Sequence, residues 1–298
     1  MGFEQAWLSY EKKEVSAQWA DIHTIYAEQK GRIIEHAAAE LQTAFAKITG
    51  KELMLCLELP EKETNGCILL KQKNGLKEGG YHLFEREGAL VIEAPDEGGL
   101  LYGAFELIKQ LQLGNAYEGM DICKEPVMPL RMLNHWDNMD GSIERGYSGN
   151  SFFFDKDEIL VDERIVTYAR LLASVGINGT VINNVNVKDA ATWLITDRYF
   201  EKLRQLSEIL ADYGIKLFLS LNYAAPVELG ELDSADPLSE EVRAWWKERM
   251  KLVFTQVPNL GGFLIKADSE GRPGPFTYGR THADGANMLA EAAEPYGG

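Results

Sequence analysis

The first part of the chain mixes helical and strand-like patterns of apolar residues. The pattern predicts a helix over residues 35–48, strands over 53–59 and 66–71, and a hairpin over 80–94 that turns at 86–88. A second helix is predicted to begin after Asp96, a residue type that caps helix N-termini, and to end at Gly114. Residues 1–125 are therefore predicted to form a small α+β domain, which carries no catalytic constellation.

After residue 126 the pattern changes to apolar runs that alternate with helical periods. The predicted strands end near residues 134, 182, 221 and 265, and the predicted helices cover residues 162–175, 197–213, 239–254 and 284–293. Because buried apolar strands linked by helices form parallel sheets, these are successive βα units. The first connection lacks G-x-G-x-x-G, so a barrel is favoured over a dinucleotide-binding doubly wound sheet.

The predicted fold class is α/β. A small N-terminal α+β domain over residues 1–125 is followed, over residues 126–298, by the first half of a (β/α)8 TIM barrel. Only four βα units are present, and four strands do not close a barrel. The chain is therefore expected to be truncated within the barrel. As an isolated polypeptide it is expected to be inactive and to aggregate through its open sheet edge.

Composition excludes several classes of protein. Hydrophobic residues make up 45% of the 298 residues and charged residues 26%, as in soluble globular proteins. The formal net charge of -16 repels phosphate and anionic membrane surfaces, so neither nucleic acid nor a membrane is an expected partner. The three cysteines form no CxxC pair and the five histidines are scattered, so neither a metal site nor a metal-dependent lyase is expected. No secretion signal pattern is present, and the expected location is the cytoplasm.

The clearest candidate chemistry follows the fourth predicted strand. Lys266, Asp268 and Glu270 have the same parity, so they point to one side if the chain stays extended. A carboxylic acid at this position can protonate a glycosidic oxygen if burial raises its pKa, and a close cation would oppose that shift. Lys266 would then have to lie nearer the substrate than Glu270. A lysine–carboxylate salt bridge at the sheet edge remains the alternative.

Polar and aromatic residues also follow the first predicted strand. Trp136 offers an apolar plate, and Asp137 and Asn138 offer hydrogen-bonding groups, a mixture that suits a sugar ring. Core packing of Trp136 is the alternative. Glu144 and Arg145 lie in a glycine-rich loop and could reach over the site, or form an exposed ion pair.

Two segments carry a resemblance to a known family. They read LRMLNHWDNMDGSIERGYSGNSFFF and GGFLIKADSEGRPGPFTYGRTHADGANMLA, and together with the N-terminal region they resemble the family 67 glycoside hydrolases, the microbial α-glucuronidases. This resemblance implies hydrolysis of the α-1,2 bond between 4-O-methylglucuronic acid and the terminal xylose of glucuronoxylan-derived oligosaccharides. It also implies an inverting mechanism that uses no cofactor.

The resemblance assigns roles to individual residues. Glu270 matches the general acid, Lys266 matches a cation near the uronate carboxylate, and Trp136, Glu144 and Arg145 match the pocket lining. Since the substrate is an anion and the chain is acidic, local cations must offset its field. Lys266, Arg145 and Arg280 are the candidates.

The resemblance also marks what lies beyond Gly298. The family's catalytic base comes from later barrel strands, and its all-helical C-terminal region carries the contacts of a homodimeric full-length protein. Asp268 is too close in sequence to Glu270 to be predicted as the base. The alternative function is a non-catalytic carbohydrate-binding or regulatory protein, which would bind oligosaccharide and release no glucuronic acid.

Overall fold

The computed structural model describes residues 8–27, 30–58, 65–268 and 271–297. The chain forms two compact units, each with its own sheet. The first comprises residues 1–131, 167–178 and 212–215, and the second comprises residues 132–166, 179–211 and 216–298. Within the described ranges, no helix has both the length and the apolar character needed to cross a membrane.

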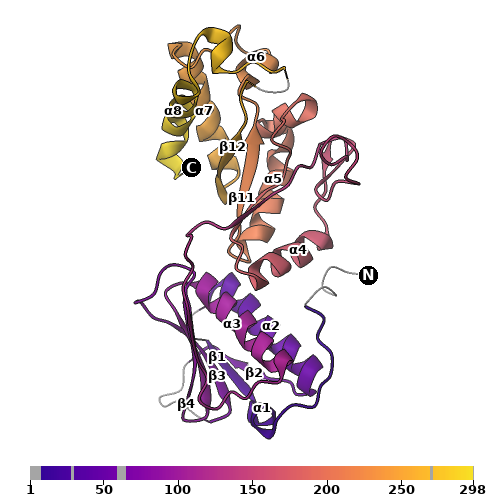
Figure 1. The fold of residues 1–298 in the computed structure, drawn as a ribbon, viewed down its shortest axis with the longest axis vertical. Coiled ribbons are helices and arrows are strands. Elements are labelled where there is room, and N and C mark those ends of the chain that lie inside the picture. The colour runs from indigo at the N-terminus through magenta and orange to yellow at the C-terminus, as the bar shows by residue number, and fades with distance from the viewer. Residues whose placement is uncertain (1–7, 28–29, 59–64, 269–270, 298) are drawn as a thin grey trace. The chain divides into compact units, whose positions relative to one another are not determined.

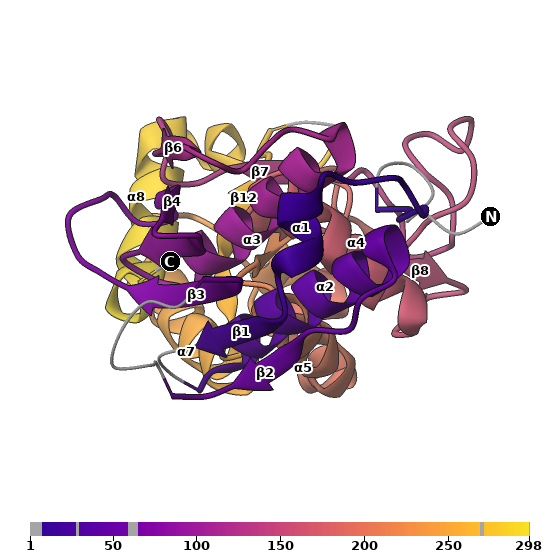
Figure 2. The ribbon, with the colours of Figure 1, turned by 90° about the horizontal axis from the view of Figure 1, so that it is seen from below.

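The first unit is built on a six-stranded mixed sheet. Its elements are α1 (Ala17–Asp21), β1 (Thr24–Ala27), α2 (Arg32–Thr49), β2 (Met54–Cys56), β3 (Cys67–Gln72), β4 (Tyr81–Arg86), β5 (Ala89–Ala94), α3 (Glu97–Leu113) and β6 (Asp121–Lys124). The strand order is β2-β1-β3-β5-β4-β6. The first four strands in this order are parallel, whereas β4 is antiparallel to both β5 and β6. Helices α2 and α3 lie side by side over the sheet (Figure 1), and Figure 2 shows β1 between β3 and β2.

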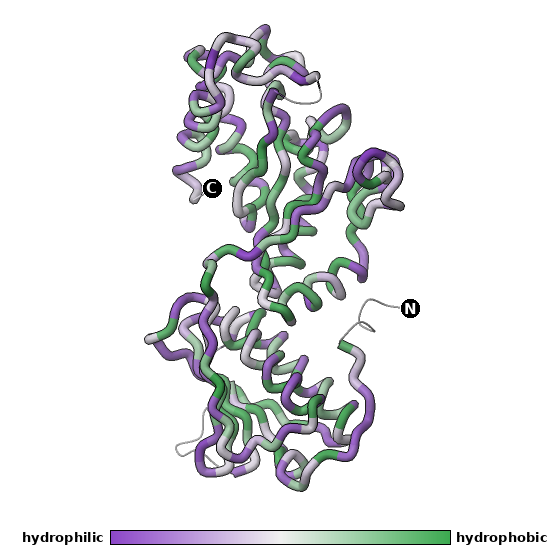
Figure 3. The backbone as a smooth tube through the Cα atoms, in the orientation of Figure 1, coloured by the Kyte–Doolittle hydropathy of each residue, from purple (hydrophilic) through white to green (hydrophobic). Residues whose placement is uncertain are grey.

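The helices of this unit form for the reasons that the sequence indicates. Apolar and polar positions alternate along α2 and α3 (Figure 3), and most buried positions are apolar, with Glu40 and Glu106 as buried charged exceptions. The Asp96 side chain accepts a hydrogen bond from the backbone N–H of Gly99 at 2.8 Å, and Gly114 ends the helix at φ 73°. Gly103 allows close packing, because a Cβ there would lie 2.4 Å from Ile92 Cγ2. Both predicted helices and the hairpin are confirmed, whereas α1, β1 and β6 were not predicted.

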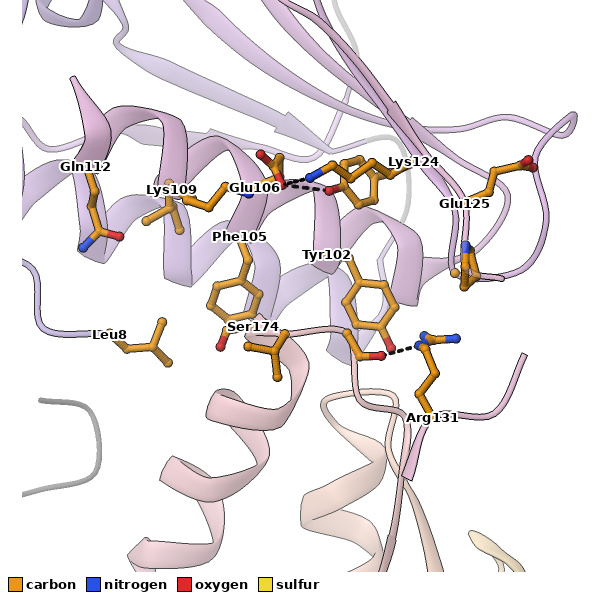
Figure 4. Close-up of a pocket in the computed structure, with 16 residues that line it drawn as sticks. Leu8, Tyr102, Phe105, Glu106, Lys109, Gln112, Lys124, Glu125, Arg131 and Ser174 are labelled. Atoms are coloured by element: carbon orange, nitrogen blue, oxygen red, sulfur yellow. Dashed lines mark hydrogen bonds and ion pairs between the residues drawn. The ribbon is translucent and has the colours of Figure 1, made fainter. Parts of the chain in front are cut away.

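A buried carboxylate on α3 is held by four donors. Glu106 is 6% exposed and accepts hydrogen bonds from Lys109 Nζ at 2.6 Å, Lys124 Nζ at 2.8 Å, Gln110 Nε2 at 2.6 Å and the Tyr81 hydroxyl at 3.0 Å. Figure 4 shows Glu106 and Lys124 directed toward one another. Burial would raise the pKa of Glu106, but these donors outweigh it and lower the pKa from 4.5 to about 2.

This shift predicts an acid-sensitive stability of the first unit. The folded-state pKa of Glu106 lies below its unfolded value, so the stabilisation is complete above pH 4.5 and is lost as the pH falls toward 2. The loss amounts to about 3 kcal/mol of unfolding free energy. Urea denaturation between pH 6 and pH 2.5 measures it, with Glu106→Gln as the control that lacks this ionisation. An equal loss in both proteins would show that other carboxylates cause it.

The second unit is built on a four-stranded parallel sheet. Its elements are β7 (Met132–Asn134), β8 (Phe154–Asp155), β9 (Glu158–Ile159), α4 (Glu163–Ser174), β10 (Gly179–Val181), η2 (Asp189–Ile195), α5 (Asp197–Ala211), β11 (Lys216–Leu221), α6 (Ala225–Glu228), α7 (Glu240–Gln256), β12 (Leu260–Ile265), η3 (Pro275–Tyr278), α8 (His282–Ala293) and η4 (Glu294–Tyr296). The strand order is β12-β11-β10-β7, and all neighbours are parallel. The boundary between the units falls within α4. The predicted alternation of strands and helices is confirmed.

The interior strands of this sheet are buried on both faces. In β11 the side chains from Leu217 to Leu221 are all at most 8% exposed. Asn183 and Ser220 link β10 to β11 through their side chains: Asn183 Oδ1 accepts from the Ser220 N–H at 2.8 Å, and the Ser220 hydroxyl donates to the Asn183 carbonyl at 2.8 Å. Polar residues that end these strands are therefore held in fixed positions.

Candidate functional site

A cavity of about 520 Å³ lies at the carboxyl ends of the four strands of the second unit. Its walls come from the segments that follow β7, β10 and β12 and from the end of β11. The lining residues are Asn138, Asp140, Ser142, Glu144, Arg145, Gly146, Asn184, Val185, Asn186, Val187, Lys188, Leu221, Asn222, Tyr223, Lys266, Arg272 and Pro273. The carboxyl edge of a parallel sheet is where α/β proteins place their binding sites.

Cations exceed anions around this cavity. Among its described lining residues, four are cationic (Arg145, Lys188, Lys266 and Arg272), and two, Asp140 and Glu144, are acidic. Arg272 is paired with Glu228, at 2.8 Å from Nη1 to Oε1. Without Arg272, the described lining residues still include three cationic and two acidic side chains, in a chain whose net charge is -16. The cavity can therefore attract an anionic group to a protein that otherwise repels one.

The loop after β7 holds the Glu144–Arg145 pair at the cavity. Glu144 has a φ of 61°, and its N–H donates to the Trp136 carbonyl at 2.9 Å. Its carbonyl accepts from Asn138 Nδ2 at 2.9 Å and from Asn184 Nδ2 at 3.3 Å. Two asparagine amides from separate strand ends thus fix a backbone conformation that a non-glycine residue seldom adopts.

Asp137 is hydrogen-bonded to the loop after β7 and does not line the cavity. It is 3% exposed, and its Oδ2 accepts from the Ser151 hydroxyl and from the Phe152 N–H, both at 2.6 Å. The prediction that Asp137 presents a hydrogen-bonding group to a sugar is therefore wrong. Its neighbour His135 packs edge-on against Phe153, and burial lowers the pKa of His135.

Trp136 is half-buried and is not among the described residues that line the cavity. It contributes its backbone carbonyl to the Glu144 turn. Its assignment as a sugar platform stays a prediction.

Arg280 is bound by both oxygens of Asp236, at 3.0 and 2.9 Å, so the proposal that it pairs with a substrate carboxylate has no support in this geometry.

The parity argument required the chain to stay extended after β12, and it does not. The strand ends at Ile265, and Asp268 has a φ of 52°. Asp268 Oδ2 accepts from the Phe276 N–H at 3.2 Å and lies 3.0 Å from His282 Nε2. The condition of the parity argument, an extended chain from Lys266 onward, is therefore not met at Asp268, and Glu270 lies outside the described residues.

Glycine permits this turn. A Cβ at position 274 would lie 2.3 Å from Asp268 N and 2.4 Å from Asp268 Cγ, so only glycine lets the two segments approach this closely. The G-R-P-G sequence after Glu270 therefore returns the chain onto Asp268. Lys266, which precedes the turn, lines the cavity together with Glu144 and Arg145. The substrate-binding roles that the family resemblance implies for these three residues stay predictions.

Several cavity residues were not predicted. Asn184, Asn186 and Lys188 all follow β10, and Asn222 and Tyr223 follow β11. Polar residues follow the second predicted strand at 183–186 and the third at 222–223, but their sequence does not show which of them line the cavity. Asn183, in the same run, is fully buried and bonded to Ser220.

A second cavity, of about 540 Å³, lies within the first unit. Tyr102 and Phe105 project from α3 into it (Figure 4). Its ionic groups bond to the protein itself: Glu106 to two lysines, and the Arg131 guanidinium to backbone carbonyls, including that of Gly176 at 2.5 Å from Nε. The cavity of the second unit is therefore the better candidate for a polar ligand. Within the described residues, no group of three or more His, Cys, Asp or Glu side chains is placed to hold a metal ion.

Comparison with known proteins identifies the family. Residues 6–107 match the model of the glycosyl hydrolase family 67 N-terminus, and residues 110–298 match that of the glycosyl hydrolase family 67 middle domain. The chain belongs to glycosyl hydrolase family 67. The resemblance recognised in the sequence is thereby confirmed, and the cavity lies within the family 67 middle domain.

Curated relatives of this family 67 chain are named alpha-glucuronidases. It is 36% identical over 320 residues to the alpha-glucuronidase of Hypocrea jecorina, covering 98% of this chain and 37% of that protein. It is 38% identical over 309 residues to the probable alpha-glucuronidase A of Aspergillus oryzae, covering 98% of this chain and 36% of that protein. The chain thus spans a little over a third of the length of these relatives.

Two solved structures share the fold of the family 67 chain. One is a GH138 enzyme targeting pectin rhamnogalacturonan II, with a TM-score of 0.58 and 17% identity, covering 92% of this chain and 37% of that one. The other is a GH115 4-O-methyl-alpha-glucuronidase with specificity for decorated arabinogalactans, with a TM-score of 0.57 and 14% identity, covering 91% of this chain and 40% of that one. At these identities the likeness concerns the fold alone.

Proposed function

We propose that this family 67 chain belongs to an α-glucuronidase that cleaves the α-1,2 bond between 4-O-methylglucuronic acid and the terminal xylose of glucuronoxylan-derived oligosaccharides. The observation that carries the proposal is the excess of cations around the cavity at the carboxyl ends of the parallel strands. A uronic acid is a sugar with one carboxylate. A cavity that combines cations with amide groups offers partners for both the charge and the hydroxyl groups.

Lys266 and Arg145 are proposed to bind the uronate carboxylate. Both line the cavity, Lys266 from the end of β12 and Arg145 from the loop after β7. Glu144 precedes Arg145 in the same loop, and a carboxylate there can accept hydrogen bonds from sugar hydroxyls. Trp136 is retained as a candidate aromatic platform for the sugar, on the strength of the family resemblance.

Glu270 is proposed as the general acid. The xylose leaving group departs as an alkoxide unless its oxygen receives a proton, so a carboxylic acid beside the glycosidic oxygen is required. In an inverting reaction a second carboxylate activates water on the opposite face of the ring, about 6.5–9.5 Å from the acid. Asp268 is a poor candidate for this base, because its carboxylate is already bonded to His282 and to the Phe276 N–H.

The barrel architecture is part of the proposal. The strands of the second unit follow one another in space in the order in which they occur in the chain, β7-β10-β11-β12. A doubly wound sheet reverses its strand order at a switch point, whereas a (β/α)8 barrel adds strands in sequence. The observed order therefore supports the first half of a TIM barrel, with the domain boundary proposed at residues 125/126.

Hydrolysis of aldouronic acids tests the function. The polypeptide that the complete gene encodes is expected to release 4-O-methylglucuronic acid, and proton NMR is expected to detect the β-anomer first, since an α-bond is inverted. The matched control is the same oligosaccharide with its uronate reduced to the neutral sugar. We expect it to be cleaved at least about tenfold more slowly, because it lacks the charge that the cations bind. Absence of release, or equal rates for both substrates, would overturn the proposal.

A further inference from the structure

We propose that Asn184 is a positioning residue, whose side-chain amide holds the turn at Glu144 and so places the Glu144 and Arg145 side chains for substrate. This inference rests on the proposed function, in which Arg145 binds the uronate carboxylate. Asn184 follows β10, whereas Glu144 and Arg145 lie in the loop after β7, and all three line the cavity. A residue at the end of one strand thereby sets the substrate affinity of residues that follow another.

The hydrogen bonds of Asn184 join its own segment to the loop after β7. Its backbone N–H donates to the Asp137 carbonyl at 2.8 Å, and its Oδ1 accepts from the Asn186 N–H at 2.9 Å. Its Nδ2 donates to Asn138 Oδ1 at 2.9 Å and to the Glu144 carbonyl at 3.3 Å. The residue is 5% exposed. Because both hydrogens of the amide are engaged inside the protein, Asn184 acts on a ligand through the groups that it holds.

The turn at Glu144 is the part of this loop that has to be held. Its φ of 61° lies in the left-handed region, which costs free energy for a residue with a Cβ. The Glu144 N–H donates to the Trp136 carbonyl at 2.9 Å, and the Glu144 carbonyl accepts from Asn138 and Asn184. Since the peptide groups on both sides of its Cα are bound, the direction of the Cα–Cβ bond is fixed, as is the backbone N–H of Arg145. Removing the Asn184 amide takes away one of the donors that fix this direction.

Substrate affinity tests this role in the polypeptide that the complete gene encodes, with aldouronic acids as substrates. Asn184→Ala is expected to raise KM by about threefold to tenfold and to change kcat by less than about twofold, because it relaxes groups that bind the sugar and leaves the proton donor in place. In a Glu144→Ala/Arg145→Ala background the same substitution is expected to change kcat/KM by less than about twofold, since the side chains that it positions are gone.

Trypsin gives a second readout that does not depend on activity. Arg145 is exposed, and trypsin cleaves the bond that follows it when the chain there opens. Asn184→Ala is expected to speed this cleavage by about threefold or more relative to wild type, because the turn is less firmly held. Mass spectrometry identifies the new end at Gly146.

Asn183→Ala is the matched control. Asn183 is the adjacent buried asparagine, but its side chain bonds to the Ser220 backbone in β11 and not to the loop. We expect it to lower the thermal midpoint and to leave both KM and the cleavage after Arg145 within about twofold of wild type. An unchanged KM in Asn184→Ala, or equal changes of KM and cleavage in both variants, overturns the inference alone. A wild-type protein that releases no 4-O-methylglucuronic acid overturns the proposed function, whereas faster cleavage in Asn184→Ala supports the hold on the turn in either case.

Discussion

Replacing Glu270 with glutamine is expected to lower the rate of 4-O-methylglucuronic acid release from aldouronic acids by about 10²–10⁴-fold. The amide occupies nearly the same volume as the carboxylic acid but has no proton to give to the glycosidic oxygen. Since the group acts on the leaving oxygen in the transition state, kcat carries the loss and KM changes little. The effect is measured as the steady-state rate at which wild type and Glu270→Gln release 4-O-methylglucuronic acid from aldouronic acids.

Two substrates with different leaving groups distinguish the loss of a proton donor from a loss of structure in Glu270→Gln. An aryl α-glucuronide releases a stable phenolate, which departs without protonation, so the Gln variant is expected to retain most of its rate on that substrate. Asp268→Asn is the matched control. It removes a carboxylate two residues before Glu270, one that is bonded to His282 and to the Phe276 N–H. Equal losses on both substrates, or full activity of Glu270→Gln on aldouronic acid, would show that Glu270 is not the proton donor.

Much of the fold could be predicted, because its longer elements carry their own periodicity. In α2 the buried positions repeat with the period of a helix, and the side chain of Asp96 caps α3 as its residue type indicates. Strand β1 could not be predicted in the same way. It has four residues and lies between two parallel neighbours, so it is defined by its partners β2 and β3 and not by a pattern of its own.

The location of the candidate site could be predicted, but its exact membership could not. Polar residues after the first and fourth predicted strands indicated the carboxyl edge of the sheet, and four of the predicted residues, Asn138, Glu144, Arg145 and Lys266, line its cavity. Alternation fails beyond the strand ends, where Glu144 and Asp268 adopt positive φ angles. Nearer the end of β7, Asp137 is buried and bonded to Ser151 and Phe152, while Asn138, the next residue, lines the cavity.

Replacing Arg170 with methionine is expected to destabilise the first unit by about 3–5 kcal/mol, because it leaves a buried carboxylate without its cation. Glu40 is 8% exposed, and both of its oxygens accept from Arg170, at 2.6 Å from Nε and 2.6 Å from Nη2. The Tyr10 hydroxyl also donates to Glu40. Burial and the neighbouring carboxylate raise the pKa of Tyr10, so the phenol stays a neutral donor at physiological pH and cannot replace the lost charge.

The double variant Glu40→Gln/Arg170→Met separates the contribution of the intact ion pair to the free energy of unfolding from the destabilisation caused by leaving Glu40 without its cation. It removes both charges, so we expect it to recover most of the stability lost in Arg170→Met, as buried ion pairs replaced on both sides commonly do. Arg204→Met is the matched control: Arg204 pairs with two carboxylates, Glu201 and Glu208, on an exposed helix face, where solvent screens the interaction and a small effect is expected. Urea denaturation at pH 7 measures all three. A loss in Arg170→Met no larger than that in Arg204→Met would mean that water reaches Glu40 once the guanidinium is removed, so that its burial depends on Arg170 itself.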